Sequence, residues 1–352
     1  MKATLLYGHK DVRVEDWPEP VAPPGWSVVE VGWSSICHSD IKEYLGPYYV
    51  MRHGRPNPIT GVSLPVILGH EFAGTVVSMN GEHPGIQVGD RVAPDGCIKD
   101  GTCWYCEHGR YNLCDGLAIL GFDAHGSHAR YVAVPNYSLH RVPDNVSDEE
   151  AAFVEPLAVA THGIRQGRVA VGDIVAVIGA GMIGLCALSA AGAAGASKVF
   201  VSEPLEGRRT RAAAMGATVL DPNDGDLVAQ LLDQTGGHGA DVAIDCVGLE
   251  SSLDSALSLS RKGGRVVIVG TYPKKPLVNM DKIGLEEREV IGSLAYADDF
   301  PRAISLLANG SVDLSSCVTG RIALRDIVEQ GFERMDADAN QQIRILVDTH
   351  AA

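Results

Sequence analysis

Three segments that lie far apart in the sequence carry side chains of the types that bind zinc. Cys37 supplies a thiol, Gly69-His70-Glu71 supplies an imidazole and a carboxylate, and Glu155 supplies a second carboxylate. Structural zinc sites use four protein ligands, whereas catalytic sites leave one position for water or substrate. A hydrogen-bonded His-Glu pair at a strand end is the alternative for His70 and Glu71 taken alone. The motifs described below favour a catalytic zinc.

A second group of zinc-binding residue types is local. Cys103, Cys106 and Cys114 lie within one short stretch, and a Cys-x-x-Cys pair lets two thiolates share one tetrahedral metal. Two residues compete as the fourth ligand. Asp100 continues the three-residue spacing, whereas Cys97 offers the better ligand atom but lies further upstream, so the spacing favours Asp100. We expect a structural zinc here rather than disulfides, because the chain shows no secretory signal.

A glycine fingerprint, Gly179-Ala180-Gly181-Met182-Ile183-Gly184, follows an apolar run and precedes a helix of small residues. Gly179 permits the tight turn, Gly181 lets the backbone approach a pyrophosphate, and Gly184 lets the helix pack close to the strand. Glu203 ends the next predicted strand, where a carboxylate bonds the ribose hydroxyls and repels a 2′-phosphate. Arg208 and Arg209 are the counter-argument, since arginines there can bind that phosphate. The pattern predicts NAD rather than NADP.

Length, composition and charge limit the classes of protein. A chain of 352 residues predicts two domains, and 45% hydrophobic with 21% charged residues is ordinary for a globular protein. The net charge of -15, without a basic stripe, argues against a nucleic-acid partner. No apolar run is long enough to span a bilayer and the N-terminus lacks a secretory signal, so we expect a cytoplasmic protein.

The residue pattern changes near residue 150. Short alternating runs with frequent glycine and proline predict a mainly β domain before it, with strands at 27–31, 72–77 and 129–134. Continuous apolar runs separated by Ala-rich stretches then predict a parallel, doubly wound sheet, with strands at 174–178, 198–201, 242–245 and 265–269. A helix is expected from Phe300, a returning strand at 343–347, and a long loop at 46–63. The predicted fold class is α/β, with a mainly β domain over 1–155 and 297–352 and a cofactor domain over 156–296.

Over its whole length the chain resembles the zinc-dependent medium-chain dehydrogenases. Within them it is most similar to the butanediol dehydrogenases, with the sorbitol dehydrogenases more distant. Besides the cysteine stretch and the glycine fingerprint, the resemblance rests on Ile36-Cys37-His38-Ser39-Asp40, Leu68-Gly69-His70-Glu71-Phe72-Ala73-Gly74, Gly89-Asp90-Arg91-Val92, Val154-Glu155-Pro156-Leu157-Ala158-Val159-Ala160, Ile291-Gly292-Ser293-Leu294-Ala295-Tyr296 and Asp298-Asp299-Phe300-Pro301.

The resemblance implies a GroES-like catalytic domain, a Rossmann domain for NAD, and two zinc ions, one catalytic and one structural. It implies a role for each candidate residue. Cys37 and His70 would hold the catalytic zinc, with Glu155 and Glu71 as the third ligand and an exchanging or outer carboxylate. Ser39 would take the substrate proton. In the cofactor domain, Glu203 and Arg208 would contact the adenosine ribose, and Val247 and Gly270 would lie beside the nicotinamide half.

The chain departs from the family pattern at three places. Asp100 stands where relatives usually have the first cysteine of the structural zinc lobe. Lys42 stands where a histidine often ends the proton relay. Gly126-Ser127-His128-Ala129-Arg130-Tyr131 replaces the Gly-Gly-Phe-Ala-Glu-Tyr run that is typical of relatives. The first departure affects the structural zinc ligands and the second affects the route of the proton.

The implied reaction interconverts a secondary alcohol or vicinal diol and its ketone. Zinc lowers the pKa of the bound alcohol, and the resulting alkoxide delivers hydride to nicotinamide C4. Butane-2,3-diol and acetoin are the first substrate pair expected, sorbitol-like polyols the second, and simple secondary alcohols the third. We expect a small-molecule alcohol or ketone as partner, no nucleic acid, no membrane, and a homodimer or homotetramer. A zinc-free quinone reductase would lack Cys37 and His70, and a non-enzymatic cofactor-binding structural protein is the remaining alternative.

Overall fold

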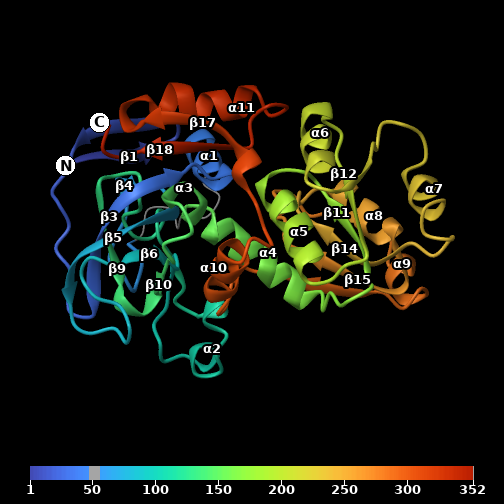
Figure 1. Ribbon diagram of the computed structural model, residues 1–352, viewed down its shortest axis with the longest axis horizontal. Coiled ribbons are helices and arrows are strands. Elements are labelled where there is room, and N and C mark those ends of the chain that lie inside the picture. The colour runs from blue at the N-terminus through green and yellow to red at the C-terminus, as the bar shows by residue number, and fades with distance from the viewer. Residues whose placement is uncertain (47–55, 352) are drawn as a thin grey trace. The chain divides into compact units, whose positions relative to one another are not determined.

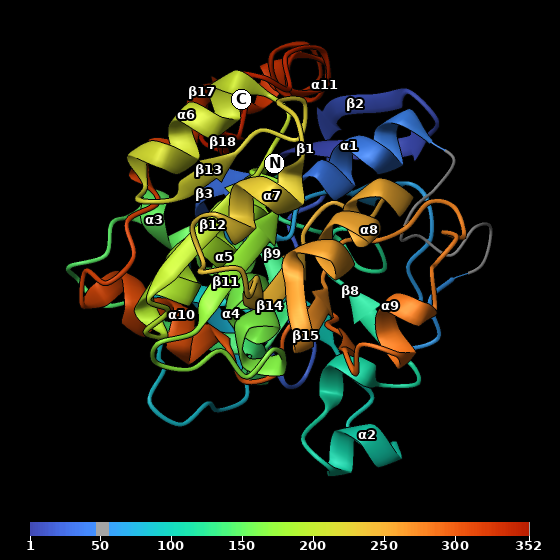
Figure 2. The same cartoon turned by 90° about the vertical axis from the view of Figure 1, so that its right-hand side faces the viewer.

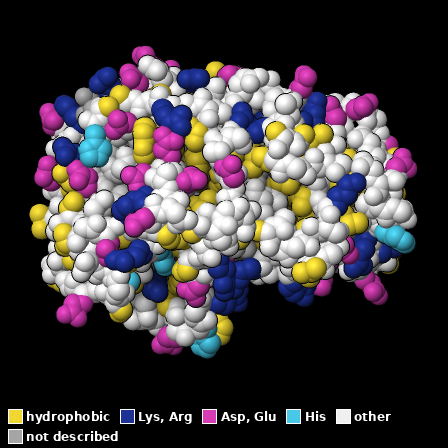
Figure 3. Space-filling view, viewed as in Figure 1, with side chains coloured by type: hydrophobic (Ala, Val, Ile, Leu, Met, Phe, Trp, Pro, Cys, Tyr) yellow, Lys and Arg dark blue, Asp and Glu magenta, His cyan; other side chains and the backbone are white. Residues whose placement is uncertain are grey.

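The computed structural model describes residues 1–46 and 56–351, which form two compact units. Unit 1 comprises Met1–Glu155, Ala303–Ala308 and Cys317–Ala352, and unit 2 comprises Pro156–Arg302 and Asn309–Ser316. The boundaries predicted from the sequence fall after residues 155 and 296. Residues 47–55 of the predicted long loop lie outside the described residues. On the face drawn in Figure 3, acidic and basic side chains are interspersed.

Unit 1 is built mainly from β-strands, as the sequence predicts. One sheet has the strand order β2-β1-β4, a seven-stranded sheet has the order β10-β6-β5-β3-β18-β17 with β9 also paired to β3, and β7 pairs with β8. The strands are β1 (Lys2–Gly8), β2 (Asp11–Asp16), β3 (Trp26–Ser35), β4 (Val66–Ile67), β5 (Glu71–Asn80), β6 (Arg91–Pro94), β7 (Cys97–Ile98), β8 (Ala118–Ile119), β9 (Tyr131–Pro135), β10 (Leu139–Arg141), β17 (Val318–Ala323) and β18 (Arg344–Asp348). Strand β18 pairs antiparallel with β3, which confirms that the last apolar run returns to this unit.

The helices of unit 1 are short. They are α1 (His38–Leu45), α2 (Trp104–Glu107), α3 (Asp148–Ala151), α11 (Arg334–Ala337), the 3-10 turns η1 (Tyr111–Leu113), η2 (Asn136–Ser138) and η4 (Leu324–Asp326), and the π-helical η5 (Ile327–Glu333). Two helices, α4 (Val154–Gln166) and α10 (Phe300–Ala308), and the turn η3 (Ser315–Cys317) cross the division points. Helix α2 lies below the seven-stranded sheet of its unit in both Figure 1 and Figure 2.

Unit 2 contains the predicted parallel, doubly wound sheet, with six strands in the order β13-β12-β11-β14-β15-β16. The strands are β11 (Ile174–Ile178), β12 (Lys198–Ser202), β13 (Thr218–Leu220), β14 (Ala240–Asp245), β15 (Ser260–Ile268) and β16 (Glu289–Gly292), and the helices are α5 (Met182–Ala193), α6 (Glu206–Ala214), α7 (Leu227–Leu232), α8 (Glu250–Leu259) and α9 (Asp281–Gly284). Helices α5 and α6 pack on β11 to β13, and α8 packs on β11, β14 and β15 (Figure 1). The strand order reverses between β11 and β14, and ligands of such sheets bind at this switch point, beyond the carboxyl ends of the strands.

Among residues 1–46 and 56–351, no helix has both the length and the apolar composition needed to cross a membrane.

Candidate functional site

Cys37 lies where strand β3 gives way to helix α1. The preceding Ile36 is fully buried in the core of unit 1 and anchors the segment. Cys37 is the N-cap residue of α1, and its backbone N–H donates to Asp40 Oδ2 at 2.9 Å. A helix N-terminus carries partial positive charge, which favours a thiolate or another anion at this position.

His70 and Glu71 lie at the start of strand β5. Gly69 before them has φ of +96°, a left-handed conformation that favours glycine, and a Cβ there would lie 2.7 Å from Ser127 Oγ. The His70 ring packs on Phe122, with the ring centroids 4.9 Å apart. Its Nε2 atom lies 3.3 Å from Ser39 Oγ. The structure therefore brings the two predicted residues Ser39 and His70 into contact.

Candidate metal ligands from two segments meet in unit 1. One ligand atom from each of Cys37, His70 and Glu71 lies within 4.8 Å of the others. Glu71 is also engaged elsewhere: it accepts hydrogen bonds from Ser35 Oγ and from Arg344 Nη2, both at 2.7 Å. Glu155 lies in the first turn of α4, outside that group of three.

The raised pKa values of the acidic side chains in this cluster indicate that a bound cation would stabilise their charged forms. Burial raises the pKa of the Cys37 thiol well above its ordinary value, and the Glu71 charge adds to that effect. Burial likewise raises the pKa of Glu155 to about 8. A divalent cation reverses this tendency, because it stabilises thiolate and carboxylate as ligands. Thiol, imidazole and carboxylate are also the donor types that zinc prefers.

The raised pKa of Glu155 gives a pH-dependence that can be measured in metal-free protein. Between its ordinary value of 4.5 and about 8, folded Glu155 keeps a proton that the unfolded chain has lost. Its stabilising contribution is therefore complete below about pH 4.5 and is lost as the pH rises through about 8. We expect the free energy of unfolding, measured by denaturant titration, to fall with pH more steeply in the parent than in Glu155→Gln. Equal slopes of unfolding free energy against pH in the two proteins would show that Glu155 is not protonated in the folded, metal-free protein.

Asp40, which the sequence analysis did not select, joins the two ligand segments. Its Oδ1 atom lies 3.7 Å from His70 Nδ1 and 3.4 Å from the Gly69 backbone nitrogen. Its Oδ2 atom lies 3.5 Å from His128 Nε2. Burial alone would raise the pKa of the Asp40 carboxyl, but the facing His70 and His128 imidazoles outweigh burial and hold it below its ordinary value.

The predicted structural zinc ligands also come together. Ligand atoms of Asp100, Cys103, Cys106 and Cys114 lie within 4.8 Å of one another, whereas Cys97 lies in strand β7, fully buried and outside this group. The Cys103 and Cys106 sulfurs are 3.6 Å apart. Two sulfurs bound to one tetrahedral zinc at about 2.3 Å would lie roughly 3.8 Å apart, so the separation suits a shared metal.

Asp100 is held as a carboxylate before any metal binds. Its Oδ1 atom accepts hydrogen bonds from the backbone N–H groups of Thr102 and Cys103, at 2.7 and 2.9 Å. These bonds hold the pKa of the Asp100 carboxyl well below its usual range. Burial raises the pKa of Cys106 to about 12, so a metal would have to displace the proton from that thiol.

The glycine fingerprint adopts the geometry that a dinucleotide requires. Gly179 follows β11 with φ of +95°. A Cβ on Gly184 would lie 1.9 Å from the Gly179 carbonyl oxygen, so only glycine lets α5 approach this closely. Gly181 is the N-cap of α5, and a Cβ there would meet only Arg208 Nη1, at 3.8 Å. The space beside Gly181 is therefore open for a pyrophosphate at the helix N-terminus, where Met182 and Ile183 begin the helix.

Glu203 lies directly after β12, beside this loop. Its Oε2 atom accepts a hydrogen bond from the Ala180 N–H at 2.7 Å and its Oε1 atom accepts one from Leu205 N–H at 3.0 Å. Arg209 forms an ion pair with Asp221 at 2.7 Å. That pair engages Arg209, one of the two arginines that could bind a 2′-phosphate, whereas Arg208 Nη1 lies beside Gly181.

Val247 and Gly270 lie at the same end of the sheet as the fingerprint. A Cβ on Gly179 would lie 2.5 Å from Val247 Cγ2, and one on Gly270 would lie 2.4 Å from the Gly248 nitrogen. Asp245, at the end of β14, accepts the N–H groups of Val247 and Gly248 at 2.9 and 3.2 Å. The structure thus brings the predicted cofactor residues at the ends of β11, β14 and β15 together.

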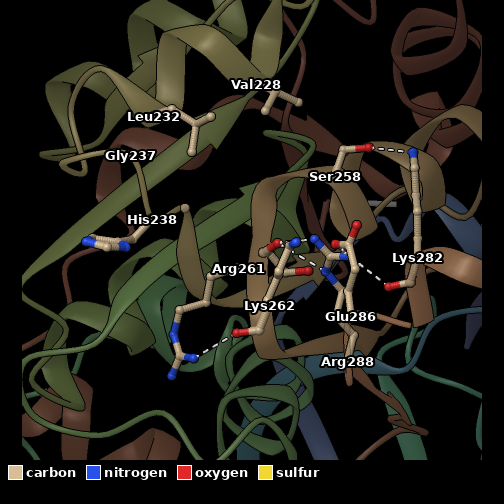
Figure 4. A pocket seen from close by; sticks show the side chains of 12 residues that line it. Val228, Leu232, Gly237, His238, Ser258, Arg261, Lys262, Lys282, Glu286 and Arg288 are labelled. Carbon is tan, nitrogen blue, oxygen red and sulfur yellow. Dashed lines mark hydrogen bonds and ion pairs between the residues drawn. The ribbon is translucent and has the colours of Figure 1, made fainter. Parts of the chain in front are cut away.

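A pocket of about 620 Å³ lies at the opposite, amino-terminal end of β14 and β15 (Figure 4). Basic side chains line it, but three of them are neutralised by carboxylates. Arg261 pairs with Asp241, Lys282 pairs with Asp254, and Arg288 pairs with Glu286. Parallel sheets bind their ligands at the carboxyl ends of the strands, so we place the chemistry there and not in this pocket.

Sequence reasoning missed Arg344 as well as Asp40 and Asp245. Arg344 is only 1% exposed, and its Nη2 atom lies 3.7 Å from Cys37 Sγ. A signal was present, because an arginine in the middle of the apolar run 343–347 must have a buried anionic partner. Asp40 and Asp245 carried no comparable signal, since an aspartate at a helix start or strand end is common.

Comparison with known proteins gives the family. Residues 23–144 match the alcohol dehydrogenase GroES-like domain and residues 183–309 match the zinc-binding dehydrogenase family. The chain is 36% identical to (R,R)-butanediol dehydrogenase of Bacillus subtilis (strain 168), over 99% of both chains. It is 32% identical to (R,R)-butanediol dehydrogenase of Neisseria gonorrhoeae, again over 99% of both. The crystal structure of 2R,3R-butanediol dehydrogenase from Bacillus subtilis matches with a TM-score of 0.91 and 35% identity, over 99% of both chains.

These matches and the site geometry define a two-domain dehydrogenase with a GroES-like domain and a Rossmann-type cofactor domain. The chain belongs to the zinc-dependent medium-chain alcohol dehydrogenase family. It is an oxidoreductase that uses zinc and NAD, as the sequence predicts in preference to a cofactor-binding structural protein.

Proposed function

We propose that this chain interconverts a vicinal diol and its hydroxyketone, with butane-2,3-diol and acetoin as the first substrate pair. The observation that carries the proposal is the full-length similarity to two butanediol dehydrogenases, at 36% and 32% identity. Sorbitol-like polyols are the second candidate, because a sorbitol dehydrogenase of Bacillus subtilis is 31% identical over 99% of the chain. Simple secondary alcohols are the third.

In the proposed mechanism the chain holds a catalytic zinc through Cys37, His70 and one carboxylate. Bound zinc supplies Lewis acidity, which lowers the pKa of the substrate hydroxyl. Ser39 would accept the hydroxyl proton at its Oγ atom while it passes its own hydroxyl proton on toward solvent, and Ser39 Oγ lies 3.3 Å from the proposed ligand atom His70 Nε2. Lys42 lies one helical turn further along α1.

Two observations bear on which carboxylate is the third ligand. Proximity favours Glu71, whose oxygen lies within 4.8 Å of the Cys37 and His70 ligand atoms. Electrostatics favour Glu155. The Glu71 carboxylate is already neutralised by Arg344. Burial raises the pKa of Glu155 to about 8, so its carboxylate is the one that needs a cation. We propose that the two exchange, with Glu155 binding the metal whenever Glu71 stays on Arg344.

The substrate proposal is tested with a panel of alcohols. Initial rates of NAD reduction are measured with both enantiomers of butane-2,3-diol, with sorbitol and with propan-2-ol, and the same panel is repeated with NADP. We expect the highest kcat/KM for one butanediol enantiomer with NAD. A higher kcat/KM for sorbitol or propan-2-ol would replace butanediol by that substrate class.

We also propose that Asp100, Cys103, Cys106 and Cys114 hold a second, structural zinc. Asp100→Ala should reduce bound zinc from two ions per chain to about one and lower the midpoint of thermal unfolding. Much of the activity should remain, because these four ligands would leave no open position for substrate. Cys97→Ala is the matched control and should keep two ions. The measurement is the zinc content per chain. Loss of zinc in Cys97→Ala with retention in Asp100→Ala would make Cys97, and not Asp100, the fourth ligand.

We also propose that the protein forms a homodimer or homotetramer and is located in the cytoplasm. Strand β16 is an edge of the six-stranded sheet, and nearby Val290, Leu294 and Leu285 are 40%, 51% and 79% exposed. An exposed edge strand with apolar neighbours is a ready surface for pairing with a second copy. Light scattering during gel filtration should give a molecular mass above that of one chain. The Val290→Lys variant should have a lower molecular mass than the parent.

A further inference from the structure

The strongest unassigned feature is a buried line of polar side chains behind the proposed catalytic zinc site. It runs from His70 through Asp40 to His128 and ends at Ser34 and Ser127. His128, Ser34 and Ser127 are all completely buried. His128 lies in the segment 126–131, which none of the roles described above uses.

The backbone fixes His128 against the segment that carries His70. The Gly126, Ser127 and His128 N–H groups donate to the carbonyl oxygens of residues 67, 69 and 68, at 2.7, 2.9 and 2.9 Å. A Cβ on Gly69 would lie 2.8 Å from His128 Nδ1, so the ring lies directly against the residue before His70. The imidazole therefore packs directly against the segment that carries His70.

Hydrogen-bond chemistry assigns a direction to this line. Asp40 Oδ2 lies 3.5 Å from His128 Nε2, which is an ion-pair distance without hydrogen-bond geometry, and a carboxylate facing Nε2 favours a proton on that nitrogen. In the neutral imidazole with its proton on Nε2, His128 Nδ1 is the acceptor, and Ser34 Oγ donates to it at 2.9 Å. Ser34 has used its proton, so Ser127 Oγ donates to Ser34 Oγ at 2.7 Å. The hydrogen bonds thus run from Ser127 to Ser34 to His128, and the His128 and His70 rings face the Asp40 carboxylate at 3.5 and 3.7 Å.

The geometry points to His128 as a positioning residue for the metal site. We propose that His128 fixes the Asp40 carboxylate, so that Oδ1 stays aimed at His70 Nδ1 and His70 presents Nε2 to the metal. This inference rests on the proposed catalytic zinc. Partners behind a metal-binding histidine orient its ring, and their removal costs about 10–100-fold in metal affinity.

Two variants separate the Asp40 contact from the Ser34 contact. The amide of His128→Gln can reach the position of Nε2 and donate to Asp40, whereas the shorter amide of His128→Asn can reach only the position of Nδ1, near Ser34. We expect His128→Asn to weaken zinc binding about 10–100-fold and His128→Gln to weaken it less. His125→Gln is the control, since His125 lies in the same segment, accepts the Ile67 N–H at 3.3 Å and packs on Trp17.

The readout is zinc retained per chain in competition with a chelator, together with the unfolding midpoint of the metal-free proteins. The zinc ion that is lost in Cys37→Ser is taken as the ion of the proposed catalytic site. A positioning role predicts weaker zinc retention in His128→Asn than in His128→Gln and His125→Gln. Equal retention in His128→Asn and the parent, or a loss that only follows the unfolding midpoints of the metal-free proteins, would overturn the inference. If the parent holds no ion that depends on Cys37, the proposed function fails instead.

Discussion

Replacing His70 by alanine should abolish turnover while leaving the fold of unit 1 intact. The substitution removes the only nitrogen from the group formed by Cys37, His70 and Glu71. The loss in kcat/KM should exceed the roughly 10–100-fold that removal of an outer partner of a metal ligand costs. Steady-state NAD reduction, metal analysis and circular dichroism check the three parts of this result.

His125→Ala is the matched control for this variant. His125 is a half-buried histidine of the same unit, and its ring lies 5.5 Å from that of Trp17. It should keep both zinc ions and activity near that of the parent. Activity near the parent value in His70→Ala, with two zinc ions still bound, would show that His70 is not a ligand.

Glu203→Gln should reduce the preference for NAD over NADP by about 10–100-fold. A hydrogen bond to a charged group contributes roughly 1.5–3 kcal/mol, and each 1.4 kcal/mol corresponds to a factor of ten in affinity. The glutamine oxygen can still accept the Ala180 N–H, so the glycine loop should keep its shape. The measurement is the ratio of kcat/KM for NAD to that for NADP.

Glu206→Gln provides the control for the change in net charge, because Glu206 lies in the first turn of α6, close in sequence to Glu203. It should leave the cofactor ratio unchanged. A parent protein that prefers NADP, or an unaltered ratio in Glu203→Gln, would show that this carboxylate does not select the cofactor.

The fold could be predicted from the sequence where local pattern and tertiary packing agree. The apolar run 174–178 is strand β11 with the same bounds, because a continuous apolar run suits a strand buried on both faces. Strand β15 begins at Ser260, ahead of the predicted 265–269, because Ser260 pairs with Ala240 before a register shift, and regular pairing with β14 starts at Arg265. Such extensions depend on the partner strand and leave no hydrophobic signal of their own.

The candidate site was predictable for residues whose chemistry is unusual at their position. Cys37, His70 and the cysteine stretch stand out because thiols and imidazoles at such spacings have few structural uses. Asp40 and His128 could not be found in this way, since their role arises from contacts between residues 40, 70 and 128 that only folding creates. Arg344 required the inference that a charge in an apolar strand must be paired.

A zinc titration of the metal-stripped protein tests the central claim most directly. Zinc is removed with a chelator, and the initial rate of NAD reduction by butane-2,3-diol is followed as zinc is returned. If Cys37 and His70 hold the ion that activates the alcohol, the rate should fall to background on stripping and recover as zinc rebinds, whereas Cys37→Ser should stay inactive throughout. Stripped protein that oxidises butane-2,3-diol at the parent rate would contradict the account.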